Sequence, residues 1–191
     1  MRSILIIVDT DDRDKELRDE IVKKIDNHVE GKVEKYFLYL DDMNLNPCVG
    51  CFNCWVKTPG KCIINDDNEL KNRLFIECDY IVLVSRILYG MYSPSFKVIL
   101  DRMIPNISPF FQLANGEMHH KKRYKKDFKM FVIGYSTKLY TGEASTFKEL
   151  FNRNMINFHC KENEFLILED SNNIQNKITT RLDNLESVKL I

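Results

Sequence analysis

Four of the six cysteines of this chain lie close together, and their spacing is the feature of the sequence that points most directly to chemistry. They follow a C-x2-C-x2-C-x7-C pattern and are Cys48, Cys51, Cys54 and Cys62. Thiolates at such spacing can enclose an iron–sulfur cluster or a zinc ion, because a loop or one helical turn can direct them at a common point. The alternative is that free cysteines pack against apolar neighbours such as Phe52 and Trp55. The spacing leaves metal and no metal open, and it favours iron–sulfur over zinc.

A second candidate segment, residues 85–95, reads Ser-Arg-Ile-Leu-Tyr-Gly-Met-Tyr-Ser-Pro-Ser and follows a predicted buried strand. Gly90 would allow the backbone to approach a ligand closely, and Tyr89 and Tyr92 offer flat faces on which an aromatic ring could stack. The alternative is an ordinary strand-to-helix loop whose tyrosines pack against their neighbours. Taken alone, the segment favours that alternative.

The composition argues against several classes of protein. Among 191 residues, 28 Lys and Arg balance 28 Asp and Glu, and a formal net charge of zero argues against a nucleic-acid partner. No apolar run approaches the roughly 18 residues that span a bilayer, so we expect no membrane association. We interpret the apolar run at residues 4–8 as a strand rather than a leader peptide, which predicts a cytoplasmic protein with reduced thiols.

The elements that must position these segments follow from hydrophobic periodicity. Continuous apolar runs predict strands, and apolar residues recurring every three or four positions predict helices. The expected strands are residues 4–8, 33–40, 80–84, 128–135 and 165–168, and the expected helices are residues 17–29, 66–75, 94–103, 145–158 and 174–185.

This alternation predicts an α/β fold, because parallel strands need crossover helices. We expect a single domain over residues 1–191, with a doubly wound five-stranded parallel sheet in the order 2-1-3-4-5 and helices on both faces. Two irregular stretches, a cysteine-rich insert at about residues 41–65 and a long loop at about residues 105–127, are the places where we expect function.

Three stretches, residues 47–67, 83–105 and 116–135, together resemble the NAD(P)H-dependent FMN reductases of flavodoxin-like fold and the related iron–sulfur flavoproteins. The resemblance implies FMN at the strand ends, a homodimer or homotetramer, and electron transfer from NAD(P)H to a small-molecule or protein acceptor. In the iron–sulfur branch, the four clustered cysteines would match the ligands of a 4Fe-4S cluster. Similar cysteine loops also occur in flavin reductases not known for clusters.

The resemblance also implies which residues would surround the flavin ring. One side of the isoalloxazine would be bordered by Ser85, Leu88, Tyr89, Gly90 and Tyr92, and its other side would be lined by Tyr135, Ser136 and Thr137.

The loop after the first strand departs from the family pattern. Relatives usually place Ser, Thr, Gly and Asn there to hold the FMN phosphate, whereas residues 9–14 read Asp-Thr-Asp-Asp-Arg-Asp and carry a formal charge of −3. Only Thr10 and Arg13 could favour an anion, and the aspartates suit the start of a helix. Arg86 is a second departure, at a position where relatives commonly have proline. The basic run at residues 119–126 could neutralise a phosphate on a partner subunit, or be solvated surface.

Two functions fit these observations. The first is a flavodoxin-like oxidoreductase that uses FMN to pass electrons from NAD(P)H to an acceptor, with no catalytic acid or base of its own because the cofactor carries the chemistry. The second is a flavin-less protein of the same fold that acts as a metal-binding or protein-interaction module. Elsewhere we expect Cys78 and Cys160 in the core and a local ion pair between Asp101 and Arg102.

Overall fold

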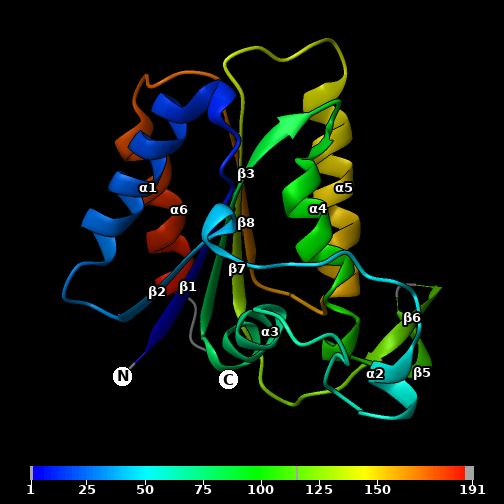
Figure 1. Cartoon of the computed structure of the whole chain (residues 1–191). Helices are drawn as coiled ribbons and strands as arrows, with labels where there is room; N and C mark the ends of the chain where they lie inside the picture. Colours follow the sequence, from blue (N-terminus) through cyan, green and yellow to red (C-terminus); the bar gives the residue numbers. More distant parts are fainter. Residues whose placement is uncertain (1, 115, 188–191) are drawn as a thin grey trace.

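Five parallel strands form the central sheet of the computed structural model, which describes residues 2–114 and 116–187 (Figure 1). Their order is β2-β1-β3-β7-β8, which confirms the predicted 2-1-3-4-5 order. They are β1 (Ser3–Val8), β2 (Glu34–Tyr39), β3 (Tyr80–Leu88), β7 (Lys129–Tyr135) and β8 (Asn163–Leu168). A two-residue strand, β4 (Met91–Tyr92), pairs antiparallel with the end of β3.

The predicted helices cover both faces of the sheet (Figure 1). On one face, α1 (Lys15–Val29) and α6 (Ile174–Ser187) pack against the strands. On the other face lie α3 (Asn68–Glu77), α4 (Pro94–Asp101) and α5 (Glu143–Asn157). The sheet therefore separates two apolar cores, as expected when strands are buried on both sides.

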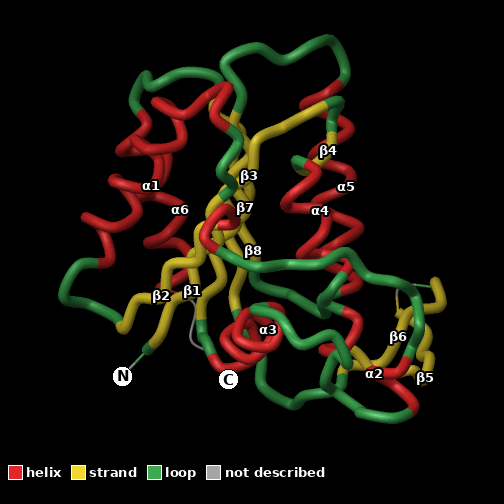
Figure 2. The backbone as a smooth tube through the Cα atoms, viewed as in Figure 1, coloured by secondary structure: helices red, strands yellow, loops and turns green. Residues whose placement is uncertain are grey.

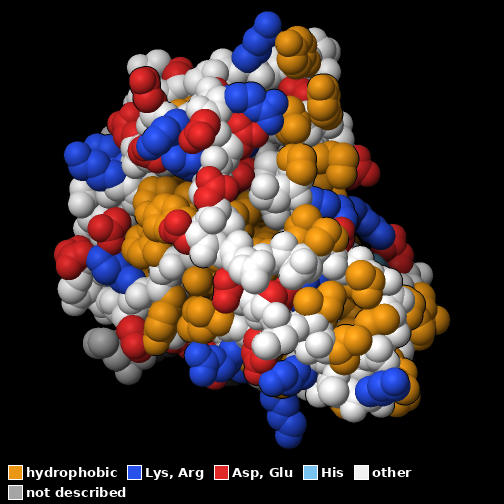
Figure 3. Space-filling model, in the orientation of Figure 1, with side chains coloured by type: hydrophobic (Ala, Val, Ile, Leu, Met, Phe, Trp, Pro, Cys, Tyr) orange, Lys and Arg blue, Asp and Glu red, His pale blue; other side chains and the backbone are white. Residues whose placement is uncertain are grey.

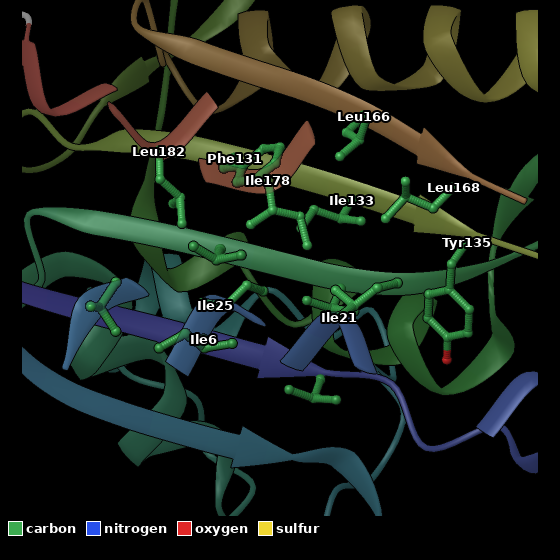
Figure 4. Close-up of a cluster of buried hydrophobic side chains, with 14 of the residues drawn as sticks. Ile6, Ile21, Ile25, Phe131, Ile133, Tyr135, Leu166, Leu168, Ile178 and Leu182 are labelled. Carbon is green, nitrogen blue, oxygen red and sulfur yellow. The ribbon is translucent and has the colours of Figure 1, made fainter. Parts of the chain in front are cut away.

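The core under α1 and α6 consists mainly of branched aliphatic side chains (Figure 4). Ile21 and Ile25 of α1 meet Ile6 of β1, because residues four apart lie on one side of a helix. Ile178 and Leu182 of α6 repeat the same spacing next to Phe131 and Ile133 of β7.

The structure corrects the expectation of a structureless loop at residues 105–127. This stretch contains an antiparallel hairpin of β5 (Ile107–Ala114) and β6 (Glu117–Lys122), preceded by the 3-10 turn η3 (Ile104–Asn106). The basic charges concealed the strand in the sequence, because β6 alternates in exposure and buries only His119 fully. Figure 2 shows this hairpin in yellow at the lower right, apart from the central sheet.

The cysteine segment crosses the face of the molecule from β2 toward this hairpin (Figure 2). It begins after the 3-10 turn η2 (Leu40–Asp42), contains one short helix, α2 (Asn53–Val56), and ends before α3. Figure 3 shows apolar side chains gathered at the lower right, over α2 and the hairpin. Among the described residues, no helix is long and apolar enough to cross a membrane.

Candidate functional site

The carboxyl ends of β1, β3 and β7 meet at one edge of the sheet, because neighbouring parallel strands run in register. Three loops that the sequence singled out therefore come together: the β1–α1 loop, the β3–β4 segment and the segment after β7. The backbone N–H of Asp9 donates to the carbonyl of Val84 at 2.8 Å, which continues the pairing of β1 with β3. In open α/β sheets this edge is where ligands bind.

Asp9 connects the first two loops. Its side chain is buried, with only 1% of the residue exposed. The carboxylate accepts the backbone N–H of Arg86 at 2.9 Å and that of Thr10 at 2.8 Å. The Ser85 hydroxyl lies 3.5 Å from the same carboxylate and is fully buried. Ser85 therefore supports the loop from inside rather than presenting its hydroxyl at the surface.

Asp14 connects all three loops. Its carboxylate accepts Arg86 Nε at 2.6 Å, the backbone N–H of Thr137 at 3.2 Å, and the Thr137 hydroxyl. Only 5% of Asp14 is exposed. Burial acts to raise the pKa of Asp14, but the hydrogen bonds from Thr137 and Arg86 outweigh it and hold the pKa below its ordinary value. Asp14 is therefore an ionised carboxylate at neutral pH, and it occupies the donors of two neighbouring segments.

The two side chains predicted to favour an anion are paired in the same way. Arg13 donates to both carboxylate oxygens of Asp11, whose pKa falls to about 2 chiefly because of that hydrogen bond. The Thr10 hydroxyl donates to Asp41, from the turn after β2. Thr10 and Arg13 of this loop, and Thr137 of the segment after β7, thus each donate to a carboxylate of the chain itself.

This pairing does not fit the phosphate of FMN. A phosphate would have to take Arg86 or Thr137 from Asp14 and would then lie beside the released carboxylate. Two unit charges of like sign at about 4 Å cost about 4 kcal/mol at an effective dielectric of 20. The start of a helix repays at most about 2 kcal/mol. The hydrogen-bond donors around this loop are already used by carboxylates of the chain, so the loop does not offer a binding site for the phosphate dianion.

The ring-binding part of the edge is more open. The Tyr89 side chain is exposed at 80%, and its positive φ of 53° turns the chain between β3 and β4. Gly90 follows with φ of 73°. A Cβ at Gly90 would lie 2.8 Å from Cβ of Thr146, so the turn lies directly against α5. Leu88 is half-buried beside them. Tyr89 therefore presents an exposed aromatic face at this edge.

Tyr92 is not exposed in the same way. Its ring stacks on Phe96 at a centroid distance of 5.5 Å and meets the edge of Phe147 at 5.0 Å. Burial raises the pKa of Tyr92 to about 12. The interpretation of a tyrosine packed against its neighbours describes Tyr92, while Tyr89 of the same segment is exposed.

Two of the residues predicted after β7 are also buried. Tyr135 and Ser136 have no exposed surface. The Ser136 hydroxyl donates to the carbonyl of Lys138 at 3.0 Å. The Tyr135 hydroxyl has no hydrogen-bond partner among the described residues, and burial raises its pKa. Thr137 is the one exposed member of this group.

The sequence did not assign a role at this edge to Asp9 or Asp14, and it noted Arg86 only as a departure from the family pattern. Arg86 makes an ion pair with Asp14, and its Nη1 is buried without a partner in the described part of the chain. The signal available in the sequence was the combination of an arginine just after the third predicted strand, residues 80–84, with an excess of aspartates after the first predicted strand.

The four clustered cysteines line one small pocket together with apolar side chains that include Ile63, Ile104 and Pro105. Their exposure differs: Cys48 and Cys51 are exposed, Cys62 is half-buried and Cys54 is buried. Burial, reinforced by the neighbouring Cys62 and Cys51, raises the pKa of Cys54. The described residues contain no group of three or more His, Cys, Asp or Glu side chains already placed to hold a metal ion. The thiols are neighbours, but they do not form a ready ligand set.

Arg102 joins this pocket to the rest of the molecule. Its side chain is 1% exposed and its Nη2 lies 2.9 Å from Asp66, whose side chain is 0% exposed. The same Nη2 lies 3.4 Å from Cys62 Sγ. This geometry corrects the expected pair between Asp101 and Arg102, because Asp101 instead pairs with Lys97 one helical turn earlier.

An open cleft of about 660 Å³ extends between β4, next to the strand-end edge, and the cysteine pocket. Met91 and Tyr92 of β4 line one end of the cleft, and Cys48, Gly50 and Trp55 line the other. Side chains of α4, α5 and the hairpin form its walls. The cysteine segment therefore lies at the far end of α4 from the strand-end edge (Figure 1).

The basic run at residues 119–126 lies on β6 and the turn that follows it, and two of its five Lys and Arg side chains form ion pairs within the chain. Lys122 pairs with Asp127, and Lys126 with Asp79. His119 is buried and lies within hydrogen-bond distance of Glu117 and Asn157.

Comparison with known proteins places these features in context. No family model matches the chain. It is 40% identical to an iron–sulfur flavoprotein of Methanocaldococcus jannaschii over 83 residues, which are 44% of this chain and 42% of that protein. An iron–sulfur flavoprotein of Archaeoglobus fulgidus is 34% identical over 74 residues, or 39% of this chain and 32% of the relative. The matches thus span less than half the length of these curated relatives.

Solved structures resemble the whole chain more distantly. An azoreductase from Bacillus anthracis has a TM-score of 0.65 with 15% identity, covering 97% of this chain and 96% of that one. An FMN-dependent NADH-azoreductase from the same species, in complex with FMN, has a TM-score of 0.60 with 12% identity and coverage of 98% and 97%. At these identities the likeness establishes the flavodoxin-like fold. In sequence the chain is similar to iron–sulfur flavoproteins, as the three stretches indicated.

Proposed function

We propose that this chain is a flavin-dependent oxidoreductase that passes electrons from NAD(P)H to a small-molecule or protein acceptor, as a homodimer or homotetramer. The observation that supports the proposal is the strand-end edge, where the segments that follow the neighbouring strands β3 and β7 carry the exposed side chains of Tyr89 and Thr137. The partial similarity to iron–sulfur flavoproteins and the fold shared with an FMN-dependent NADH-azoreductase support it. A bound flavin would supply the hydride and electron chemistry, while this chain's residues would hold and orient its ring.

The test is a titration of the purified protein with flavin, followed by quenching of flavin fluorescence. We expect saturable binding in the wild type and a loss of up to about tenfold in affinity in Tyr89→Ala, because ring stacking contributes about 0.5–1.5 kcal/mol. Phe110→Ala is the matched control, since Phe110 is 70% exposed and lies on the hairpin. Wild-type protein that binds neither riboflavin nor FMN at any accessible concentration would refute the proposal.

The cysteine pocket is proposed as the site of a 4Fe-4S cluster that relays electrons. Its support is the placement of all four thiols around one pocket and the names of the two curated relatives. Iron and sulfide should be retained after anaerobic reconstitution, and Cys48→Ala should lower the iron content. Cys78→Ala, a core cysteine outside the set, should not. Equal iron content in all three proteins would contradict the assignment.

A flavin-less protein that binds metal or a partner is the second candidate. The self-paired acidic loop favours it, because Thr10 and Arg13, the two side chains there that were predicted to favour an anion, already donate to Asp41 and Asp11. Flavin binding separates the two candidates: the first requires saturable flavin binding whether or not metal is retained, whereas the second predicts no flavin binding, with metal retained if the protein is a metal-binding module.

A further inference from the structure

The start of α1 after β1 is the position at which the order 2-1-3-4-5 and the direction of the helix dipole would both place an anionic end of a ligand. In this chain the position already holds a negative group. Asp14 reaches back across the edge, and its carboxylate takes the Arg86 guanidinium, the Thr137 N–H and the Thr137 hydroxyl. These are the kinds of donors that a phosphate would need.

The other arginines near the loop are paired with carboxylates in the same way. Three arginines lie close enough to influence the pKa values of this region: Arg13 and Arg86 lower the pKa of Asp11, and Arg18 acts to lower that of Tyr135. Arg13 pairs with Asp11, Arg86 with Asp14, and Arg18 with Asp19 at 3.0 Å. A phosphate would therefore enter a region whose arginines are already neutralised and whose other carboxylates, those of Asp9 and Asp12, add further negative charge.

Carboxylates have a complementary preference. An ionised carboxylate only accepts hydrogen bonds, and a sugar-like hydroxyl can donate one without bringing charge. A hydroxyl placed at this end of the site would leave the pairs of Arg86 and Arg13 intact, because it brings no charge that competes with Asp14 and Asp11 for those guanidinium groups.

We propose that the strand-end site takes a flavin whose side chain ends in a free hydroxyl, the riboflavin class, in preference to FMN. This inference rests on the proposed flavin function and specifies its ligand. Asp14 determines this preference, because it occupies the Arg86 and Thr137 donors that a phosphate would need. Tyr89 does not contribute to the preference, because the ring that it would stack on is the same in riboflavin and FMN.

Parallel titrations with riboflavin and with FMN test the inference on the intact chain. In the wild type we expect riboflavin to bind at least about tenfold more tightly than FMN, because one uncompensated like-charge contact is worth at least that factor. Asp14→Asn should improve FMN binding about tenfold and change riboflavin binding less than about twofold.

Asp12→Asn is the matched control, since it removes the same charge from the same loop at an exposed residue that makes none of Asp14's contacts. It should improve FMN binding less than about threefold, because an exposed charge is screened by solvent. The wild-type ratio needs no variant, so the test stands even if Asp14→Asn folds poorly. FMN binding more tightly than riboflavin overturns the selectivity and leaves the flavin function intact, whereas binding of neither flavin overturns both.

Discussion

Asp66 is the residue on which the position of the cysteine segment most depends. Its carboxylate lies 2.9 Å from each of the two Nη atoms of Arg102, and it accepts the backbone N–H of Asn46 at 3.0 Å. Burial acts to raise the pKa of Asp66, yet these hydrogen bonds, first that of Arg102, lower it from 3.8 to about 2. One carboxylate therefore holds both ends of the segment against α4.

We expect Asp66→Asn to lower the free energy of unfolding by about 3 kcal/mol at pH 7, because the change leaves the buried Arg102 unpaired. The folded-state pKa of Asp66 lies below its unfolded value, so the wild-type stabilisation is complete above about pH 4 and is lost as the pH falls through about 2. Urea denaturation of both proteins between pH 7 and pH 2 should show the gap closing.

Asp101→Asn provides the control for that experiment. Asp101 pairs with Lys97 on the surface, where the two side chains are 49% and 47% exposed. Such pairs contribute at most about 0.5 kcal/mol. A gap between wild type and Asp66→Asn that stays constant down to pH 2 would disprove the role of this ion pair.

At the scale of elements, the turn between β3 and β4 decides how closely α5 approaches the strand-end edge. Gly90 has a φ of 73°, and a Cβ there would lie 2.8 Å from Cβ of Thr146 and 3.3 Å from the carbonyl oxygen of Glu143. The first turn of α5 therefore contacts the backbone that presents Tyr89.

Gly90→Ala should accordingly destabilise the protein by about 3 kcal/mol, of which about 1–2 kcal/mol comes from the positive φ and the remainder from the close approach. Gly31→Ala isolates the first contribution, because Gly31 has a φ of 69° and nothing within 4 Å of its would-be Cβ. Thermal denaturation of the two variants measures the difference. Equal losses would show that α5 yields to the extra methyl group.

At the scale of the whole molecule, the central sheet and the hairpin differ in how they are held. Every residue of β7 is buried, whereas β5 is only half-buried or exposed along its length. The hairpin is held to the rest of the chain by contacts such as the Trp55 indole N–H, which lies 3.1 Å from each of two carbonyls, those of Ile104 and Ile107.

We therefore expect the hairpin to open locally while the sheet stays folded. In hydrogen–deuterium exchange, peptides from β5 and β6 should exchange well before peptides from β7, because protection follows burial and local contact density. Similar exchange rates in both regions would indicate that the hairpin and the sheet unfold as one unit.

The sequence alone was enough to predict the layered α/β architecture. Strands such as β1 and β3 are nearly unbroken apolar runs, and α1 repeats its apolar residues every four positions. These signals lie within one segment, so they survive without knowledge of the rest of the chain. The hairpin escaped prediction because β5 is half-buried or exposed along its whole length and contains a proline, while β6 is largely charged and polar.

Only the tertiary structure decided what the candidate residues do. Asp14 meets Arg86, 72 residues away, and Thr137, 123 residues away, and no local pattern encodes such meetings. Tyr89 and Tyr92 are alike in sequence, but a turn of the chain leaves one exposed at 80% and the other at 4%. The amino-acid sequence determined which elements form, because that choice depends on nearby side chains. The folded chain determined which charges are paired and which faces are free, because both depend on contacts across the sheet.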